Sequence, residues 1–150
     1  MTQTLPLPVV IHEYPASAAQ FAVCIAIRLA VFVQEQQVPL EDERDALDDT
    51  ARHFLASGDG QPVGTARLLM QPDGTARIGR VAVLAACRGR GVGAALMRHI
   101  EDLTTAPIIV LDAQTRALPF YQGLGYEPSG EVFLEAGIPH RHMRKVRRSI

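Results

Sequence analysis

The chain has 150 residues and a mass of 16.3 kDa, which is the size of one ordinary domain. Its composition is 47% hydrophobic and 21% charged, so it has enough apolar surface for a packed core, unlike a disordered chain. The formal net charge of -1 provides no overall positive field that would attract nucleic acid or an anionic membrane. We therefore expect one globular domain over residues 1–150, with no nucleic-acid or membrane partner and with any anion site confined to a local feature.

Cysteine usage and the N-terminal sequence indicate the compartment. Cys24 and Cys87 are too few for a disulfide framework and lack metal-ligand spacing. Residues 1–8 lack the charged start and apolar core of a signal peptide, and the longest apolar run, Phe21 to Ile27, is too short to span a bilayer. These features predict a cytoplasmic protein without a bound metal.

The N-terminal part predicts a strand followed by a helix. Val9 to Tyr14 is β-branched and aromatic and stops at Pro15, as a strand would. Apolar residues at spacings of three and four then predict a helix from about Ala18 to Gln36, capped by Ser17. Arg28 interrupts the apolar face of this helix, so its side chain either pairs with a carboxylate or points into a ligand cleft.

The middle of the chain predicts a loop and an antiparallel meander. The stretch from Glu41 to Asp49 is acidic and aperiodic, and we interpret it as a solvated loop. Strand patterns follow at Arg52 to Ala56, Pro62 to Met70 and Ala76 to Leu84, with glycine and aspartate turns between them. If the acidic loop lay over a cleft, it would favour a cationic ligand.

The C-terminal half alternates helix and strand patterns. A glycine loop precedes apolar residues at helical spacing and then a β-rich run, which together form a βαβ unit. The residues concerned are Val92, Leu96, Ile100 and Leu103 in the helix and Ile108 to Leu111 in the strand. We expect a short helix at about Ala117 to Leu124 and strands through Val132 to Leu134 and His142 to Val146. The pattern predicts an α+β fold around a mixed, mostly antiparallel sheet flanked by helices.

The glycine loop has the chemistry of an anion site. Gly89, Gly91 and Gly93 alternate where a strand turns into a helix, so backbone N–H groups are open to a ligand. The helix adds unpaired N-terminal donors, which suit a phosphate or pyrophosphate, and Arg88 and Arg90 could add ion pairs at the rim. No Gly-Lys-Ser/Thr sequence ends the loop, which excludes a Walker A site, and the preceding meander disfavours NAD. A tight turn without a ligand is the alternative.

Two motifs resemble a known family. Val81-Ala82-Val83 followed by Arg88 to Gly93 resembles the acetyl-CoA-binding motif of the GNAT superfamily of N-acetyltransferases. The segment from Gln114 to Tyr126 is similar to the second motif of that family, with Gln114 in place of the commoner asparagine. Val31 to Gln36 and Glu135 to His140 resemble the ElaA-type predicted acyltransferases within the superfamily.

The resemblance implies direct transfer of an acetyl group from acetyl-CoA, as co-substrate, to a small-molecule amine, without a metal. It implies a bulged strand with the pantetheine arm along Val81 to Leu84, and an N–H of Val83 that polarises the acetyl carbonyl. It assigns to Tyr121 a proton or hydrogen bond for the thiolate. The donor-site residues that it implies are Val81, Ala82, Val83, Arg88, Gly89, Arg90, Gly91, Val92, Gly93, Ala94, Gln114 and Tyr121.

The amine must lose a proton before it attacks, which costs roughly 4.6 kcal/mol at pH 7 for an unperturbed alkyl ammonium. A base would reduce this cost. We favour Glu135 and His140, because a carboxylate and an imidazole on one hairpin could face the acceptor. The other candidates are Glu35, Glu43, Asp45 and His53, of which His53 could equally be a structural histidine.

Two other functions remain open. Arg28, Phe32 and the acidic residues after them resemble the start of acyl-homoserine-lactone synthases, although the tryptophan expected in that family is absent. A CoA-binding sensor or partner-binding module would keep the glycine loop and transfer nothing. The acceptor stays unidentified, and an exposed sheet edge would allow a homodimer.

Overall fold

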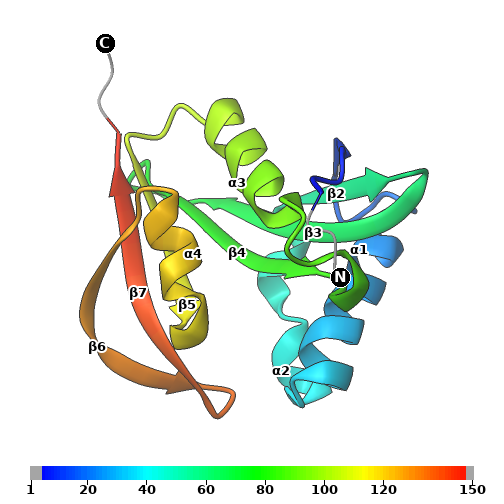
Figure 1. Ribbon diagram of the computed structural model, residues 1–150. Helices are drawn as coiled ribbons and strands as arrows, with labels where there is room; N and C mark the ends of the chain where they lie inside the picture. Colours follow the sequence, from blue (N-terminus) through cyan, green and yellow to red (C-terminus); the bar gives the residue numbers. More distant parts are fainter. Residues whose placement is uncertain (1–4, 148–150) are drawn as a thin grey trace.

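The structure is a computed structural model that describes residues 5–147. Residues 1–4, which belong to the N-terminal segment that lacks signal-peptide features, and residues 148–150 lie outside the described residues. One sheet of seven strands has the order β1-β2-β3-β4-β5-β7-β6, with helices on both faces (Figure 1). The strands are β1 (Val10–Tyr14), β2 (Arg52–Gly58), β3 (Gln61–Met70), β4 (Ala76–Val83), β5 (Ile108–Gln114), β6 (Glu127–Glu135) and β7 (Ile138–Val146). All neighbouring strands are antiparallel except β4 and β5, which confirms the predicted α+β class.

Helical segments connect these strands. They are α1 (Phe21–Arg28), the π-helix η1 (Leu29–Glu35), α2 (Leu40–Glu43), the 3₁₀ segments η2 (Ala46–Asp49), η3 (Ala85–Cys87) and η4 (Thr115–Ala117), α3 (Val92–Leu103) and α4 (Leu118–Gly123). Within the range that the structure describes, no helix is long and apolar enough to cross a membrane.

Two predictions for the segment before β2 were wrong. The first helix begins at Phe21 after Gln20, with no side-chain cap, so Ser17 does not cap it. The acidic stretch is not a solvated loop, because it folds into α2 and η2. Asp45 starts η2 with a capping box, and the buried side chains of Glu43 and Asp48 hold the segment against the sheet.

The two faces of the sheet have separate apolar clusters. Helix α3 buries Val92, Leu96 and Ile100 in the larger one, whereas Leu103, which the helical spacing placed with them, is 42% exposed. Helix α1 and η1 form the smaller cluster on the opposite face of β2 to β4. Helix α4 packs on the same side as α3, because Tyr121 belongs to the larger cluster.

A bulge in β4 separates β4 from β5. The parallel pair extends only from Ala76 opposite Ile109 to Arg77 opposite Val110. Beyond this point the register of β3 with β4 shifts, and Arg80 adopts the left-handed region with φ 51°, which non-glycine residues rarely occupy. The extra residue bends β4, so β4 and β5 part and a gap opens between them.

Candidate active site

A cavity of about 1330 Å³ follows the gap between β4 and β5. Gly93 and Tyr121 line it from the side of α3 and α4, and Arg77 and Asp112 line it from the opposite face of the sheet. The cavity therefore passes through the sheet, and ligands can meet in it from both faces. Its volume exceeds that of a pocket for one small ligand.

The glycine loop forms one end of this cavity. Gly89 and Gly91 have φ of 74° and 85°, which only glycine adopts readily. Gly91 occupies the N-cap position of α3, and the residues after it, up to Ala94, line the cavity. The first-turn N–H groups have no partners within the helix, so the loop can bind an anion.

The side chains of Arg88 and Arg90 have protein partners in this structure. Arg88 donates from Nη2 to Oε1 of Glu35 at 2.7 Å and from Nε to the carbonyl of Val83 at 3.0 Å. Arg90 donates from Nε to the carbonyl of Leu5 at 3.1 Å and does not line the cavity. These contacts join the loop to η1 and to the N-terminal segment, instead of supplying the free rim charges that the sequence suggested.

The edge of β4 that faces the gap offers backbone donors. The N–H of Leu84 donates to the carbonyl of Val63 on the β3 side, at 2.9 Å. Because successive peptide groups of a strand point to opposite edges, the N–H groups of Val83 and Val81 point towards the gap. A ligand lying along β4 can therefore accept hydrogen bonds from this edge.

Tyr121 lines the cavity from α4. Its ring is buried against Phe120 and Tyr126, with centroid distances of 4.9 and 6.1 Å. Burial raises the pKa of the Tyr121 hydroxyl to about 12, and no residue between 5 and 147 accepts or donates a hydrogen bond there. The hydroxyl is therefore protonated at neutral pH and free to donate to a ligand.

Glu135 and His140 meet at the β6–β7 hairpin and line the same cavity. Nδ1 of His140 lies 2.6 Å from the carbonyl oxygen of Ile138, so in the neutral ring Nδ1 carries the proton and donates to that carbonyl. Nε2 is then the basic nitrogen, and it lies 3.6 Å from Oε2 of Glu135. The pair can accept a proton at Nε2 and stabilise the imidazolium with the carboxylate.

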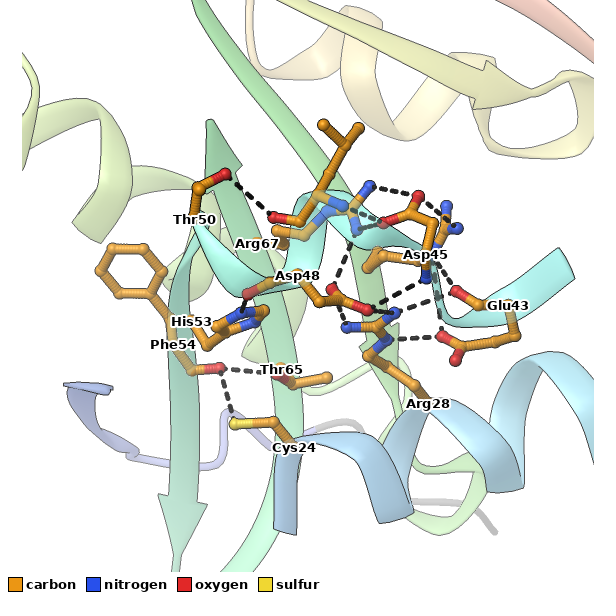
Figure 2. A network of polar contacts seen from close by, with 12 residues as sticks. Cys24, Arg28, Glu43, Asp45, Asp48, Thr50, His53, Phe54, Thr65 and Arg67 are labelled. Atoms are coloured by element: carbon orange, nitrogen blue, oxygen red, sulfur yellow. Dashed lines mark hydrogen bonds and ion pairs between the residues drawn. The ribbon is translucent and has the colours of Figure 1, made fainter. Parts of the chain in front are cut away.

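Arg28 is part of a buried ion-pair network (Figure 2). Its guanidinium binds Oε1 of Glu43 at 2.5 Å and Oδ1 of Asp48 at 2.8 Å, and all three side chains are 1% exposed. Arg67 also binds Oδ1 of Asp48, at 2.9 Å. Burial alone would raise the pKa of Asp48, but the hydrogen bonds and charges of Arg28 and Arg67 hold it at about 2. Arg28 thus pairs with carboxylates, and it does not line the cavity.

The structure separates the remaining base candidates. Glu43 and Asp45 line the cavity, but Glu43 is bound to Arg28 and Asp45 to Arg67, at 2.8 Å. Glu35 is bound to Arg88 and lines only a smaller neighbouring pocket. His53 lies outside both pockets, where its Nε2 is 2.9 Å from the Asp48 carbonyl and burial lowers its pKa. His53 is therefore a structural histidine.

Gln114 has a partner that its sequence position did not reveal. Its Nε2 donates to Oε1 of Gln36 at 2.7 Å, and its Oε1 accepts from Nε of Arg116 at 3.1 Å. The longer amide thus reaches from the end of β5 to the end of η1, at the edge of the cavity.

The cavity unites nearly all the residues predicted for the donor site. Every one of them except Arg90 lines it. Sequence reasoning missed Leu69, Arg77 and Asp112, which line the face opposite α3. Their strand patterns gave no signal of this, because their meeting depends on the bulge and on the pairing of β4 with β5.

The comparisons with known proteins agree with this geometry. The family model described as an acetyltransferase (GNAT) domain matches residues 15–147. The uncharacterized N-acetyltransferase YjcF of Bacillus subtilis (strain 168) is 41% identical over 123 residues, covering 79% of this chain and 87% of that protein. Protein ElaA of Escherichia coli (strain K12) is 36% identical over 142 residues, covering 90% and 93%.

Solved structures share the fold. The crystal structure of Escherichia coli ElaA superposes with a TM-score of 0.81 at 34% identity, over 92% of this chain and 99% of that one. The CoA-dependent acyl-homoserine lactone synthase BjaI has a TM-score of 0.73 at 17% identity, over 94% and 84% of the two chains, a likeness of fold alone. From the matching family model and the similarity to ElaA and YjcF, the chain belongs to the GNAT family of acetyltransferases, among the relatives of ElaA.

Proposed function

We propose that the protein is an acetyl-CoA-dependent N-acetyltransferase that transfers the acetyl group directly to the primary amine of a small molecule or peptide. The observation that carries the proposal is the cavity through the sheet, which has a left-handed glycine loop at one end and an unpartnered tyrosine hydroxyl in its wall. Donor and acceptor would enter from opposite faces and meet between β4 and β5.

The residues on the α3 side fit coenzyme A. The first-turn N–H groups of α3 would hold the pyrophosphate, which favours a positive helix end and unpaired donors. The gap-facing N–H groups of Val81 and Val83 would bind the pantetheine arm and the acetyl oxygen, where negative charge develops. When bound, acetyl-CoA supplies an activated thioester.

Tyr121 would donate a hydrogen bond to the departing sulfur. With a pKa of about 12, the phenol is roughly 3.5 pKa units less acidic than a thiol near 8.5, so complete proton transfer would be uphill by about 5 kcal/mol. A strong hydrogen bond in a buried site stabilises the thiolate without that cost. We therefore assign Tyr121 as a hydrogen-bond donor that touches the leaving group.

His140 would take the proton from the amine. Its Nδ1 is held by the Ile138 carbonyl, which leaves Nε2 to accept a proton directly or through a water. The carboxylate of Glu135, 3.6 Å away, would stabilise the protonated ring. Both side chains stand on the wall that an acceptor would contact.

A titration and a turnover assay test the proposal. Isothermal titration calorimetry should show binding of acetyl-CoA and CoA, with no binding of NAD or ATP under the same conditions. Thiol release in the presence of a panel of primary amines should then show multiple turnovers. Binding without turnover on any amine would instead support the CoA sensor, and no CoA binding would leave the glycine loop as an ordinary turn.

We also propose that the protein works in the cytoplasm. Cys24 and Cys87 are free thiols, and this state persists in a reducing compartment.

A further inference from the structure

The acceptor half of the cavity is the part on the sheet face opposite α3. It contains Arg77, whose guanidinium makes only one hydrogen bond within residues 5–147. Arg77 lies where β4 and β5 part, and its side chain is 31% exposed. Its Nη1 donates to Oδ2 of Asp112 at 3.1 Å. Nε and Nη2 make no hydrogen bond to any residue within 5–147, and neither is among the fully buried unpartnered atoms, so both are accessible.

Two neighbouring arginines in the acceptor half, Arg67 and Arg80, form hydrogen bonds with the segment 40–49. Arg67 binds Asp45 and Asp48 through Nη1. Arg80 donates from Nε to the Glu43 carbonyl at 2.9 Å and from Nη2 to Asp45 at 3.4 Å. The carboxylates of Glu43, Asp45 and Asp48 are thus engaged by other arginines. The carboxylate of Asp42 also lines the cavity, but within residues 5–147 it makes no ion pair with Arg77, whose one carboxylate partner is Asp112.

Asp112 fixes the orientation of the Arg77 guanidinium. Oδ2 of Asp112 accepts the hydrogen bond from Nη1 of Arg77, and Oδ1 of Asp112 lies 3.0 Å from Nδ1 of His142. This arrangement leaves Nε and Nη2, the two nitrogens whose N–H bonds run parallel on one edge of a guanidinium, for a two-pronged contact. Arg52 uses the same two nitrogens to bind the carboxylate of Glu13, at 2.6 and 2.8 Å.

We propose that the acceptor is a primary amine that also carries an anionic group, and that Arg77 binds this group through Nε and Nη2. The inference rests on the proposed transferase function and specifies the chemical class of its acceptor. Asp112, which holds Arg77, and Gln114, which pairs with His140, are two residues apart on β5, or roughly 7 Å along the strand. This spacing favours an amine separated from its anionic group by several bonds over an α-amino acid.

Matched amines test the proposal through thiol release. The probes are 5-aminopentanoate, the uncharged-tail analogue pentylamine, the dication 1,5-diaminopentane and 3-aminopropyl phosphate. A charge-assisted contact predicts that kcat/KM for an anionic amine exceeds that for pentylamine by about 10- to 100-fold. The ratio of kcat/KM for 5-aminopentanoate to kcat/KM for 3-aminopropyl phosphate identifies which anion the subsite prefers.

Variants assign the preference to Arg77. Arg77→Ala should bring the anionic amine and pentylamine to near parity, and Arg77→Glu should favour 1,5-diaminopentane. Arg144→Ala is the matched control, because Arg144 lies beside this site on β7, opposite Val110, but does not line the cavity; it should keep the wild-type ratio. Unchanged CoA affinity by calorimetry shows that each variant is folded.

Turnover of pentylamine equal to that of both anionic amines would overturn the proposal while leaving the transferase function intact. An equal loss of preference in Arg144→Ala and Arg77→Ala would also overturn it, because a general field effect would then explain the selectivity. If no amine is acetylated, the proposed function fails, and calorimetry of the same probes with the CoA-bound protein decides the subsite. Weaker binding of the anionic amines in Arg77→Ala supports it, and equal binding rejects it.

Discussion

The cluster around Arg28 and the cavity wall around Arg77 both contain arginines and carboxylates close to the bulged strand β4. In the Arg28 cluster the charges bind one another, and the side chains of Arg28, Glu43 and Asp48 are 1% exposed. In the cavity wall, the side chain of Arg77 makes one hydrogen bond, to Asp112, and is 31% exposed. The first cluster can hold structure in place, whereas the second has donors left for a ligand.

This difference separates polar groups that pair with one another from polar groups for which we propose a function. Tyr121 and Nε2 of His140 resemble Arg77, since each lines the cavity with an atom that lacks a hydrogen bond to a residue within 5–147. A buried charge without a partner is costly, and each charged group of the Arg28 network has an ion-pair partner within the protein, although Oε2 of Glu43 and Nε of Arg67 make no hydrogen bond. The comparison predicts that changes in the network alter the free energy of unfolding, and that changes in the cavity wall alter binding and turnover.

Arg28→Ala should have the largest effect on stability. It leaves two buried carboxylates without their main partner, and breaking a buried pair in this way costs about 3–5 kcal/mol. Urea unfolding followed by circular dichroism measures the loss. Arg52→Ala is the control, since the Arg52–Glu13 pair is 41% and 33% exposed and exposed pairs contribute about 1 kcal/mol or less. Equal effects of the two substitutions would mean that the buried network contributes no more to stability than an exposed ion pair.

Gly91→Glu should weaken donor binding at least about 100-fold, because a carboxylate at the positive end of α3 repels an anion. The left-handed φ adds strain of about 1–2 kcal/mol for any side chain, which Gly91→Ala measures separately. Gly74→Glu is a matched charge control, since Gly74 has φ 87° and open space around its Cβ but lies outside the cavity. Calorimetry with acetyl-CoA should show near wild-type affinity for Gly74→Glu. Wild-type affinity in a folded Gly91→Glu variant would remove the loop from the donor site.

Tyr121→Phe should lower kcat about 10- to 100-fold and leave the dissociation constant for acetyl-CoA nearly unchanged, because only the hydrogen bond to the leaving sulfur is lost. Since the pKa of Tyr121 is raised to about 12, the hydroxyl stays protonated below pH 11 and should cause no alkaline fall in kcat there. Tyr126→Phe is the control, because its hydroxyl binds Glu101 at 2.7 Å outside the cavity. Full activity of Tyr121→Phe across the pH range would reject the assignment.

The order of the elements and the glycine loop could be predicted from the sequence, because they depend on local patterns. The meander strands, the βαβ unit and the short helix before β6 are present with bounds close to those expected. Gly91 was identifiable because a left-handed turn before a helix favours glycine. His140 and Glu135 were identifiable as a pair because one tight hairpin joins them.

The acidic stretch and the acceptor wall could not be predicted in the same way. Periodicity gives no sign that Asp48 is buried, because its partners, Arg28 and Arg67, come from an earlier helix and a later strand. The one sequence feature that indicated a buried ion pair was an arginine on an apolar helix face, followed by several acidic residues. Arg77 reads as an alternating strand residue, and only the short pairing of β4 with β5 brings it to the cavity.

The smallest effect concerns the pH dependence of stability. The pKa of Asp48 falls from 3.8 in the reference state to about 2 in the folded protein, because its bonds to Arg28 and Arg67 outweigh burial. A lowered folded pKa stabilises the protein fully above pH 4, and this contribution of about 2 kcal/mol is lost as the pH falls from 4 to 2. The difference in unfolding free energy between the wild type and Asp48→Asn should therefore shrink over that interval, in urea titrations at fixed ionic strength. A constant difference would mean that the carboxylate of Asp48 is not held by the two arginines, and the network would then be no better paired than the cavity wall.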